Sequence, residues 1–415
     1  MPNPVRHIVI VALAIGLLSM LFFMALVLHV PHILVPVLII IAEYFFVRYL
    51  IRTISTEVSP VVKDKWRIYP VFALGIGLFV YNAYLVDEKY GGWDAWCMWS
   101  LHAKFLSGGA DRWWKMFLAS FAEHTDYPLL LPGINGFFMR YLQLYCWSLV
   151  AYITYVTSIS FGLAIPVLLF LVNVQRNAVI AILVLFVLAT NTFYVSSSVS
   201  QYADLPLALY FLCALLAIDQ AKDNKIWLML SAASLGCCMW TKNEGVILAA
   251  LFIAFNAKQF FSKQGIKWFL MGIFLPCMVL VIFKVGYAPA NDLVGSLNSG
   301  TFKQLLMSKR YSMIGNHFWL YLNEHFLYAV IGFAAYLVLC IIERKGPSRH
   351  FYMLIACMVV YLFIYVLSTQ DLEWHLATSQ ERLMIQLMPA MLYVVTTRFS
   401  TINKESLVGV FRRKV

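Results

Sequence analysis

Side chains that could do chemistry are concentrated between Asp87 and Gly136, in a sequence that is otherwise largely apolar. Four carboxylic acids there could each act as a general base toward an attacking hydroxyl: Asp87, Glu88, Asp94 and Asp126. His124 and Tyr127 flank the last of them and could line the same site. Because such groups are costly inside a bilayer, the segment predicts chemistry at a membrane surface, held in place by the apolar remainder of the chain.

Asp94 has two interpretations. A helix over 91–106 lying in the membrane interface would place Trp96 and Trp99 on one stripe and Asp94 on the opposite side. The tryptophans would then anchor in the headgroups while the carboxylate faces the protein. Asp before an apolar run is also a good N-cap, so position alone leaves capping and catalysis equally open.

Asp126 belongs to the motif HTDYPLLLP, in which Pro128 and Pro132 predict a turn that re-enters the membrane. His124 and Asp126 are two residues apart and could supply a metal ligand or orient a base. The alternative is a turn in which Asp126 only satisfies backbone donors.

Three further segments place charged side chains beside apolar runs. Asp204 stands in YADLPLAL, Lys242 and Glu244 interrupt two short apolar runs in TKNEG, and Glu381-Arg382 open the last run. Charges there are costly unless they line a wet cavity or pair internally, although TKNEG could also be a simple exposed turn. Lys242 and Arg382 could bind a phosphate through charge-assisted hydrogen bonds, with interfacial snorkelling as the competing role for Arg382.

The composition defines the scaffold around these residues. Of 415 residues 62% are hydrophobic and only 12% charged, and the mean hydropathy is +0.78. Soluble domains carry about 25% charged residues, so the chain is expected to be an all-α polytopic membrane protein. A span needs about 20 apolar residues, which predicts about twelve transmembrane helices, near 8–28, 32–50, 68–86, 145–172, 178–196, 204–220, 226–240, 245–258, 268–286, 325–342, 350–368 and 384–397.

The basic residues predict the orientation of these helices. A cytoplasmic N-terminus places 20 of the 31 Lys and Arg residues on the cytoplasmic side with 7 acids, and leaves 11 basic residues against 13 acids outside. The net charge of +11 is therefore explained by the orientation of the protein in the membrane. The sequence shows no soluble basic face of the kind that a nucleic-acid partner would require. We expect a multi-pass protein of the cytoplasmic membrane with its site on the outer, periplasmic side.

This topology divides the chain into three parts. We predict an N-terminal two-helix hairpin with a cytoplasmic loop at 1–67, a transmembrane catalytic domain at 68–397, and a basic cytoplasmic tail at 398–415. The outer loops are expected at 87–144, 287–324 and 369–383, the first of them carrying interfacial amphipathic helices.

The motifs WDAW, HTDYPLLLP, YADLPLAL, TKNEG and ERLMIQLMP, in this order within 68–397, resemble the GT-C glycosyltransferases. They are most similar to the protein O-mannosyltransferase and aminoarabinose-transferase group, glycosyltransferase family 39. The resemblance implies an enzyme that moves a sugar from a polyprenyl-phosphate donor to a glycan, lipid or protein acceptor outside the cytoplasmic membrane.

The resemblance also implies roles for particular residues. Asp94 matches the acid of the family's first outer loop, Asp126 falls in its proline-containing element, and Lys242 and Arg382 match positions that meet the donor phosphate. The chain departs from the family where Ala95 replaces the second acid of an Asp-Glu pair. Such a pair does occur at Asp87-Glu88, so these acids stay candidates, and Tyr127, His124, Asp204, Glu244 and Glu381 are expected to form the wall of the site.

The sequence gives less information about cofactors and leaves other functions open. A divalent cation, Mg²⁺ or Mn²⁺, could share the stabilisation of a departing phosphate, but no ligand set in the sequence requires one. The eight cysteines form no CxxC and no Cys/His metal spacing, which argues against zinc. A flippase or exporter of lipid-linked glycans, or a non-catalytic assembly subunit, would fit the same apolar scaffold.

Overall fold

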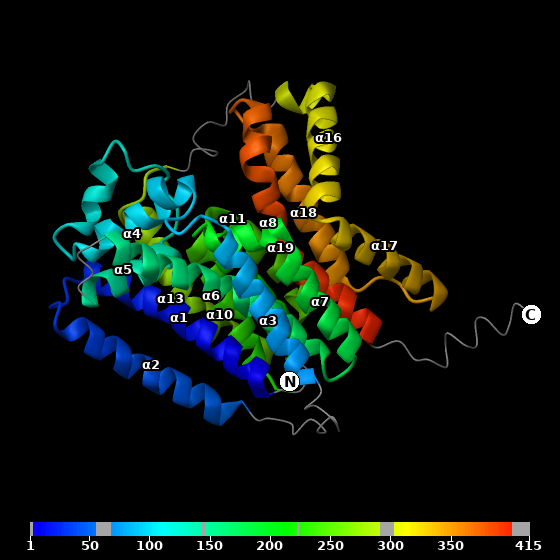
Figure 1. Cartoon of the computed structure of the whole chain (residues 1–415). Helices are drawn as coiled ribbons and strands as arrows, with labels where there is room; N and C mark the ends of the chain where they lie inside the picture. Colours follow the sequence, from blue (N-terminus) through cyan, green and yellow to red (C-terminus); the bar gives the residue numbers. More distant parts are fainter. Residues whose placement is uncertain (1–2, 55–67, 143–146, 222–223, 291–302, 401–415) are drawn as a thin grey trace, which may run out of the picture. The chain divides into compact units, whose positions relative to one another are not determined.

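The computed structural model describes residues 3–54, 68–142, 147–221, 224–290 and 303–400, and within them every regular element is helical (Figure 1). The all-α class is therefore confirmed, whereas the tail beyond residue 400 and much of the 54–67 connection lie outside the described residues. The helices are α1 (Asn3–Val27), α2 (Leu34–Thr53), α3 (Ile68–Leu85), α4 (Ser100–Ser107), α5 (Leu130–Tyr141), α6 (Trp147–Asn173), α7 (Ala178–Thr190), α8 (Thr192–Val199), α9 (Asp204–Gln220), α10 (Ile226–Thr241), α11 (Asn243–Phe255), α12 (Ala257–Phe260), α13 (Gly265–Gly286), α16 (Ser308–His325), α17 (Leu327–Ile342), α18 (Arg349–Leu367) and α19 (Leu372–Ser400).

Six of the described helices are long and apolar enough to cross a membrane: α1, α2, α3, α6, α13 and α18. Two bent pairs, α7 with α8 and α16 with α17, would raise the number to eight if each pair is one span. The length and composition of these helices indicate a multi-pass membrane protein, while the larger number of twelve spans stays a prediction. The sequence-based number of spans is larger partly because it counts α10 and α11, which are apolar but only 16 and 13 residues long.

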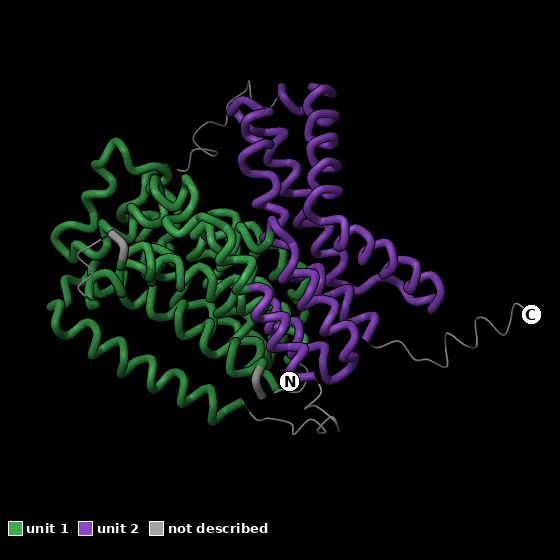
Figure 2. Tube along the Cα trace, viewed as in Figure 1, with its two compact units in different colours: residues 1–61, 80–165, 194–290 green, residues 62–79, 166–193, 291–415 purple. Residues whose placement is uncertain are grey.

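The chain forms two compact units (Figure 2). Unit 1 comprises 1–61, 80–165 and 194–290, and unit 2 comprises 62–79, 166–193 and 291–415. These boundaries cut across the three parts expected from the sequence, because residues of the expected catalytic domain occur in both units.

The core of unit 1 is built on α10, which packs against α9, α11 and α13. Small residues bring α10 and α13 close together. A Cβ on Gly236 would lie 2.3 Å from Pro276, and one on Gly272 would lie 2.2 Å from the carbonyl oxygen of Met229. Close backbone approach at glycine is a common way to pack helices inside a membrane. Lipid tails are as apolar as the helix surfaces, so burial of apolar area alone does not drive helices together there.

The expected outer loop at 87–144 is largely helical in unit 1. A π-helical turn, Ala95–Trp99, runs directly into α4, a short 3-10 helix follows at Trp113–Leu118, and the apolar α5 packs against α4 and α1. The helix expected at 91–106 is therefore present, but its predicted tryptophan stripe is wrong. Trp96 is half exposed whereas Trp99 is buried against Leu131. A π-helical turn advances by less than 100° per residue, which moves these two side chains onto different faces.

Unit 2 contains α16 to α19. The axes of α16 and α17 differ by 96° at a break between His325 and Leu327. The expected loop at 369–383 is mostly the beginning of α19, whose first turn is capped by Asp371 Oδ1 accepting from Trp374 N at 2.9 Å. The other end of α19 is fixed by an ion pair of 2.6 Å between Arg398 and Glu343.

Candidate functional site

Asp126 is the centre of one buried polar cluster in unit 1. Asn243 Nδ2 donates to Asp126 Oδ2 at 2.7 Å, and Lys284 Nζ lies 3.9 Å from the same oxygen. Lys284 Nζ also donates to the backbone carbonyl of Asp126 and, at 2.7 Å, to Asn243 Oδ1. The three side chains thus contact one another in a ring. The carboxylate, which is almost fully buried, ties its turn to the start of α11 and the end of α13.

Lys242 is the centre of a second cluster. Its ammonium lies 2.9 Å from Asp204 Oδ1 and 3.2 Å from Glu244 Oε1, and 5.8 Å from the centre of the Tyr127 ring. The side chains of Lys242 and Asp204 are only 6% and 3% exposed. A cation in this position is stabilised both by the two carboxylates and by the aromatic ring face.

The break between α10 and α11 positions the second cluster. Lys242 adopts an extended backbone, with φ −151° and ψ 160°, which ends α10 and lets α11 begin at Asn243. The chain doubles back so tightly that a Cβ on Gly245 would lie 1.9 Å from the carbonyl oxygen of Cys238. Only glycine fits here, so the TKNEG segment is a built junction and not a simple exposed turn.

Ser19 of α1 connects the two motifs that carry these clusters. Its hydroxyl donates to the carbonyl of Leu129, just after the HTDYP turn, and accepts from the indole of Trp240 at the end of α10, both at 3.1 Å. Gly133 lies against the same side chain, where a Cβ would be 2.3 Å from Ser19 Oγ. These contacts fix Asp126 relative to the α10–α11 junction.

The acids of the 87–94 segment are placed differently from one another. Asp87 is exposed, whereas Glu88 Oε2 accepts a 2.7 Å hydrogen bond from Ser200 Oγ. Asp94 is partly buried, and its backbone N–H donates to Tyr202 Oη at 3.4 Å. The Asp94 carboxylate makes no capping hydrogen bond to the helix that follows. The segment is thus attached to residues 200–202, directly before the start of α9.

Two residues beside these clusters have strained backbones. Gln201 has φ 62° and His124 has φ 49°, both in the left-handed region that non-glycine residues rarely adopt. The Oε1 atom of Gln201 is buried without a hydrogen-bond partner. His124 is exposed, and its ring lies edge-on to Tyr127 with 5.5 Å between ring centres. Backbone strain of this kind tends to collect at functional sites.

His102 of α4 is buried beside this region as a neutral imidazole. Its Nε2 lies 3.1 Å from the carbonyl oxygen of Glu123. Burial lowers the pKa of His102 to about 4, against a partial opposing effect of the Glu123 carbonyl and the Asp126 charge. His102 is therefore uncharged at neutral pH and contributes packing and orientation to the turn that precedes Asp126.

Comparison with family models, with curated proteins and with solved structures found no match. The functional inference therefore rests on the residues and the geometry of this chain.

The remaining two candidates, Glu381 and Arg382, lie in unit 2 near the start of α19. Glu381 Oε1 lies 3.5 Å from His325 Nε2, and Glu324 lies 3.9 Å from the same nitrogen. Burial raises the pKa of Glu381, an effect that His325 partly offsets. Arg382 is partly buried on the same helix.

The clusters include residues that sequence reasoning missed, namely Asn243, Lys284, Ser19 and Ser200. Lys284 carries a recognisable signal, because a lysine inside the apolar run at 268–286 is costly without a partner. Asn243 stands between two charged residues of TKNEG and could have been included with them. The two serines carry no signal, since a serine within an apolar helix usually bonds its own backbone.

Together the clusters form one polar region with three carboxylates, Asp126, Asp204 and Glu244, and two ammonium groups, Lys242 and Lys284. With all five ionised, one negative charge is in excess. Among the described residues no group of three or more His, Cys, Asp or Glu is placed to hold a metal ion. The region is suited to orienting a polar, hydroxyl-bearing molecule and to balancing a transferred charge.

Proposed function

We propose that the chain is a membrane glycosyltransferase that moves a sugar from a polyprenyl-phosphate donor to an acceptor at the outer face of the cytoplasmic membrane. The supporting observation is the buried polar region, because four separate segments contribute charged groups to it: the HTDYP turn, the start of α9, the α10–α11 junction and the end of α13. Three of these segments carry the motifs that suggested such an enzyme in the sequence.

The carboxylates divide into two kinds, which suggests their roles. Asp126 and Asp204 are buried and each is paired with an ammonium group, so each already serves as the charge partner of a lysine. Asp94 is partly exposed at the beginning of its helix and is better placed to take a proton from an acceptor hydroxyl. We therefore assign the general base to Asp94, keep Glu88 and Asp87 as the alternative candidates, and assign Asp126 and Asp204 to positioning.

The resemblance in the sequence assigns the basic residues Lys242 and Arg382 to the donor phosphate. The departing polyprenyl phosphate gains charge in the transition state, which cationic side chains stabilise. Arg382 offers a guanidinium suited to a phosphate. Lys242 already has two carboxylate partners, so direct contact with phosphate requires it to leave Glu244, the more distant and more exposed of the two. A divalent cation, Mg²⁺ or Mn²⁺, could join the phosphate when the donor is bound.

The test is sugar transfer by purified Asp94→Asn protein in liposomes containing a polyprenyl-phosphate sugar. The substitution retains the shape of the side chain but removes its basicity, so we expect transfer to fall by about 10²–10⁴-fold. Asp111→Asn is the matched control, because Asp111 is an exposed acid of the same 87–144 segment and should retain activity.

Transfer by Asp94→Asn above about a third of the wild-type rate would exclude Asp94 as the base and direct attention to Asp87 or Glu88. A wild-type protein that moves lipid-linked sugar across the bilayer without transferring it, and does so equally well as Asp94→Asn, would instead identify a flippase.

A further inference from the structure

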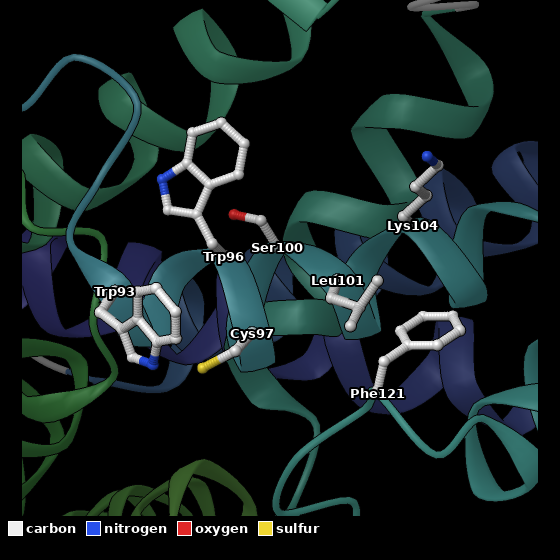
Figure 3. Close-up of a pocket in the computed structure, with 7 residues that line it drawn as sticks. All are labelled: Trp93, Trp96, Cys97, Ser100, Leu101, Lys104 and Phe121. Atoms are coloured by element: carbon white, nitrogen blue, oxygen red, sulfur yellow. The ribbon is translucent and has the colours of Figure 1, made fainter.

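A groove lies on the surface of unit 1 along the π-helical turn and α4 (Figure 3). Its volume is about 370 Å³, which falls within the range of small-molecule sites. Most of its lining residues are apolar, namely Trp93, Trp96, Cys97, Leu101 and Phe121. The others are Ser100 and Lys104, and of the lining residues only Lys104 carries a charge. The groove therefore offers an apolar surface with one cation.

The groove belongs to a segment that lies at the ends of candidate membrane spans. The 3-10 helix at 113–118, which packs against α4, begins with Trp113. The Trp113 ring lies 5.4 Å from that of Phe23, near the end of α1, and 4.7 Å from that of Tyr287, directly after α13, between ring centres. The span α3 ends at Leu85, shortly before Trp93. The ends of α1, α3 and α13 are thus close to this segment, as expected for a segment at a bilayer surface.

Large apolar side chains of the same segment are exposed. Trp93 is 76%, Leu118 74% and Phe121 66% exposed. The Trp96 ring is also half exposed, and its indole N–H donates to the carbonyl of Gly91 at 3.3 Å. Exposed apolar patches mark interaction sites, and tryptophan in particular collects where a membrane meets water. Lipid is therefore the surrounding that suits these side chains.

An anionic phospholipid matches the groove in both apolarity and charge. The methylene groups of an acyl chain suit Leu101 and the aromatic rings, and a headgroup phosphate accepts from the ammonium of Lys104. Ser100 lies one helical turn before Lys104, where its hydroxyl can donate to an ester oxygen next to the phosphate. A zwitterionic headgroup carries its own cation, so a lysine attracts it less than it attracts an anionic one.

The order of the residues orients the lipid. Figure 3 shows Lys104 and Trp93 at opposite ends of the row of side chains, with Cys97 toward the Trp93 end. The carboxylate of Glu123 acts on the Cys97 thiol and would repel a phosphate there. The phosphate is therefore expected at the Lys104 end and the acyl chain along the rest of the groove.

We infer that the groove along the π-helical turn and α4 binds an anionic phospholipid of the surrounding bilayer, with its phosphate at Lys104 and an acyl chain against Trp96 and Leu101. The inference does not depend on the proposed function, because its ligand is a lipid of the bilayer and not the sugar donor. A lipid bound here holds the segment that carries Asp94 against the membrane surface.

The experiment is photocrosslinking of the full chain in nanodiscs of phosphatidylcholine. A trace of either phosphatidylglycerol or phosphatidylcholine carries a photoactivatable group in its acyl chain, and mass spectrometry measures the adducts on residues 93–104. We expect about fivefold more labelling by the phosphatidylglycerol probe, since one lysine near a membrane surface contributes about 1 kcal/mol toward anionic lipid. Lys104→Gln should abolish this excess. Lys115→Gln is the matched control and should retain it, because Lys115 is an exposed lysine of the same segment that does not line the groove.

A second pair of variants tests the apolar part of the groove. Trp96→Ala should lower the labelling by both probes by a similar factor, because the acyl chain loses the same contact whichever headgroup it carries. Trp114→Ala is the matched control, since Trp114 is 41% exposed in the same segment but does not line the groove.

The outcomes decide the inference whether or not the protein transfers sugar. An excess that is lost in Lys104→Gln, with labelling by the phosphatidylcholine probe unchanged, supports the lysine contact and shows that the variant is folded. Equal labelling by both probes in the wild type, or an excess that survives Lys104→Gln, overturns the inference. Displacement of the phosphatidylglycerol probe by an equimolar amount of polyprenyl phosphate also overturns it and identifies a donor site. Crosslinks between two copies of the chain through 93–104 overturn it in favour of an interface between copies.

Discussion

The Lys242→Met substitution distinguishes two roles for a lysine that the sequence assigns to phosphate binding. In the structure its ammonium compensates Asp204 at 2.9 Å and Glu244 at 3.2 Å, and removing it leaves two carboxylates without this cation. Loss of one partner from a buried ion pair costs about 3–5 kcal/mol. The side chain of Glu244 is 15% exposed, against 3% for Asp204, so we expect a value near the lower end, about 3 kcal/mol.

A loss of this size is a large part of the total stability of a domain, which is about 5–15 kcal/mol. The assay is equilibrium unfolding in mixed micelles, with the free energy of unfolding of the variant compared with that of the wild type. Lys258→Met removes an exposed lysine and should change stability by less than about 0.5 kcal/mol.

A triple variant provides the decisive control. Lys242→Met combined with Asp204→Asn and Glu244→Gln removes every charge of the cluster and should recover most of the lost stability, because no buried charge is then left unpaired. If Lys242→Met alone unfolds like the wild type while the KM for lipid-linked donor rises, the ammonium is available for phosphate and the ion-cluster reasoning is wrong.

Two further predictions concern Arg382 and His102. Arg382→Ala should raise the KM for the lipid-linked donor by about tenfold to a hundredfold, which is the effect of losing one charge-assisted contact. Arg176→Ala removes an exposed arginine and should leave this KM unchanged. An unchanged KM and turnover for Arg382→Ala would refute the assignment of Arg382 to the phosphate. His102 has a folded-state pKa of about 4 against 6.5 in the unfolded chain. Its contribution to the free energy of unfolding is therefore fully present above pH 6.5 and is lost as the pH falls toward 4. The wild type should lose about 2 kcal/mol more between pH 7 and pH 5 than His102→Asn, and equal pH dependence in unfolding experiments would show that His102 does not titrate in this way.

The helical membrane class could be predicted from composition because long apolar runs have few alternative structures in water or lipid. The helix after Asp94 was also expected, but the faces of its tryptophans were not. A π-helical turn depends on tertiary packing, here the burial of Trp99 against Leu131, and no local sequence pattern predicts it. The same limit applies to α5, whose burial against α1 and α4 follows from glycines at the contact, such as Gly136 beside Ala103.

The sequence predicted which residues belong to the candidate site better than it predicted which of them pair with one another. Spacing along the chain identified Asp126, Asp204 and Lys242, since charged residues beside apolar runs stand out. It did not show that Lys242 pairs with Asp204, 38 residues away, or that Lys284 reaches Asp126 across 158 residues. Such pairings are set by how α9, α10 and α13 pack, which is a property of the folded unit and not of any one segment.

The buried charges are a poor way to stabilise this fold, and that is why they indicate a function. Replacing a buried ion pair by well-packed apolar residues is often neutral or stabilising, by about 1–4 kcal/mol, and isolated charges are costly at membrane depth. A chain that needed only a scaffold could place leucines where Asp204 and Lys242 meet. Instead, unit 1 ends α10 early, requires glycine at position 245 and retains a strained Gln201 beside the cluster. Each of these features costs stability, and together they hold carboxylates and ammonium groups at defined distances, as a site that orients a polar substrate requires.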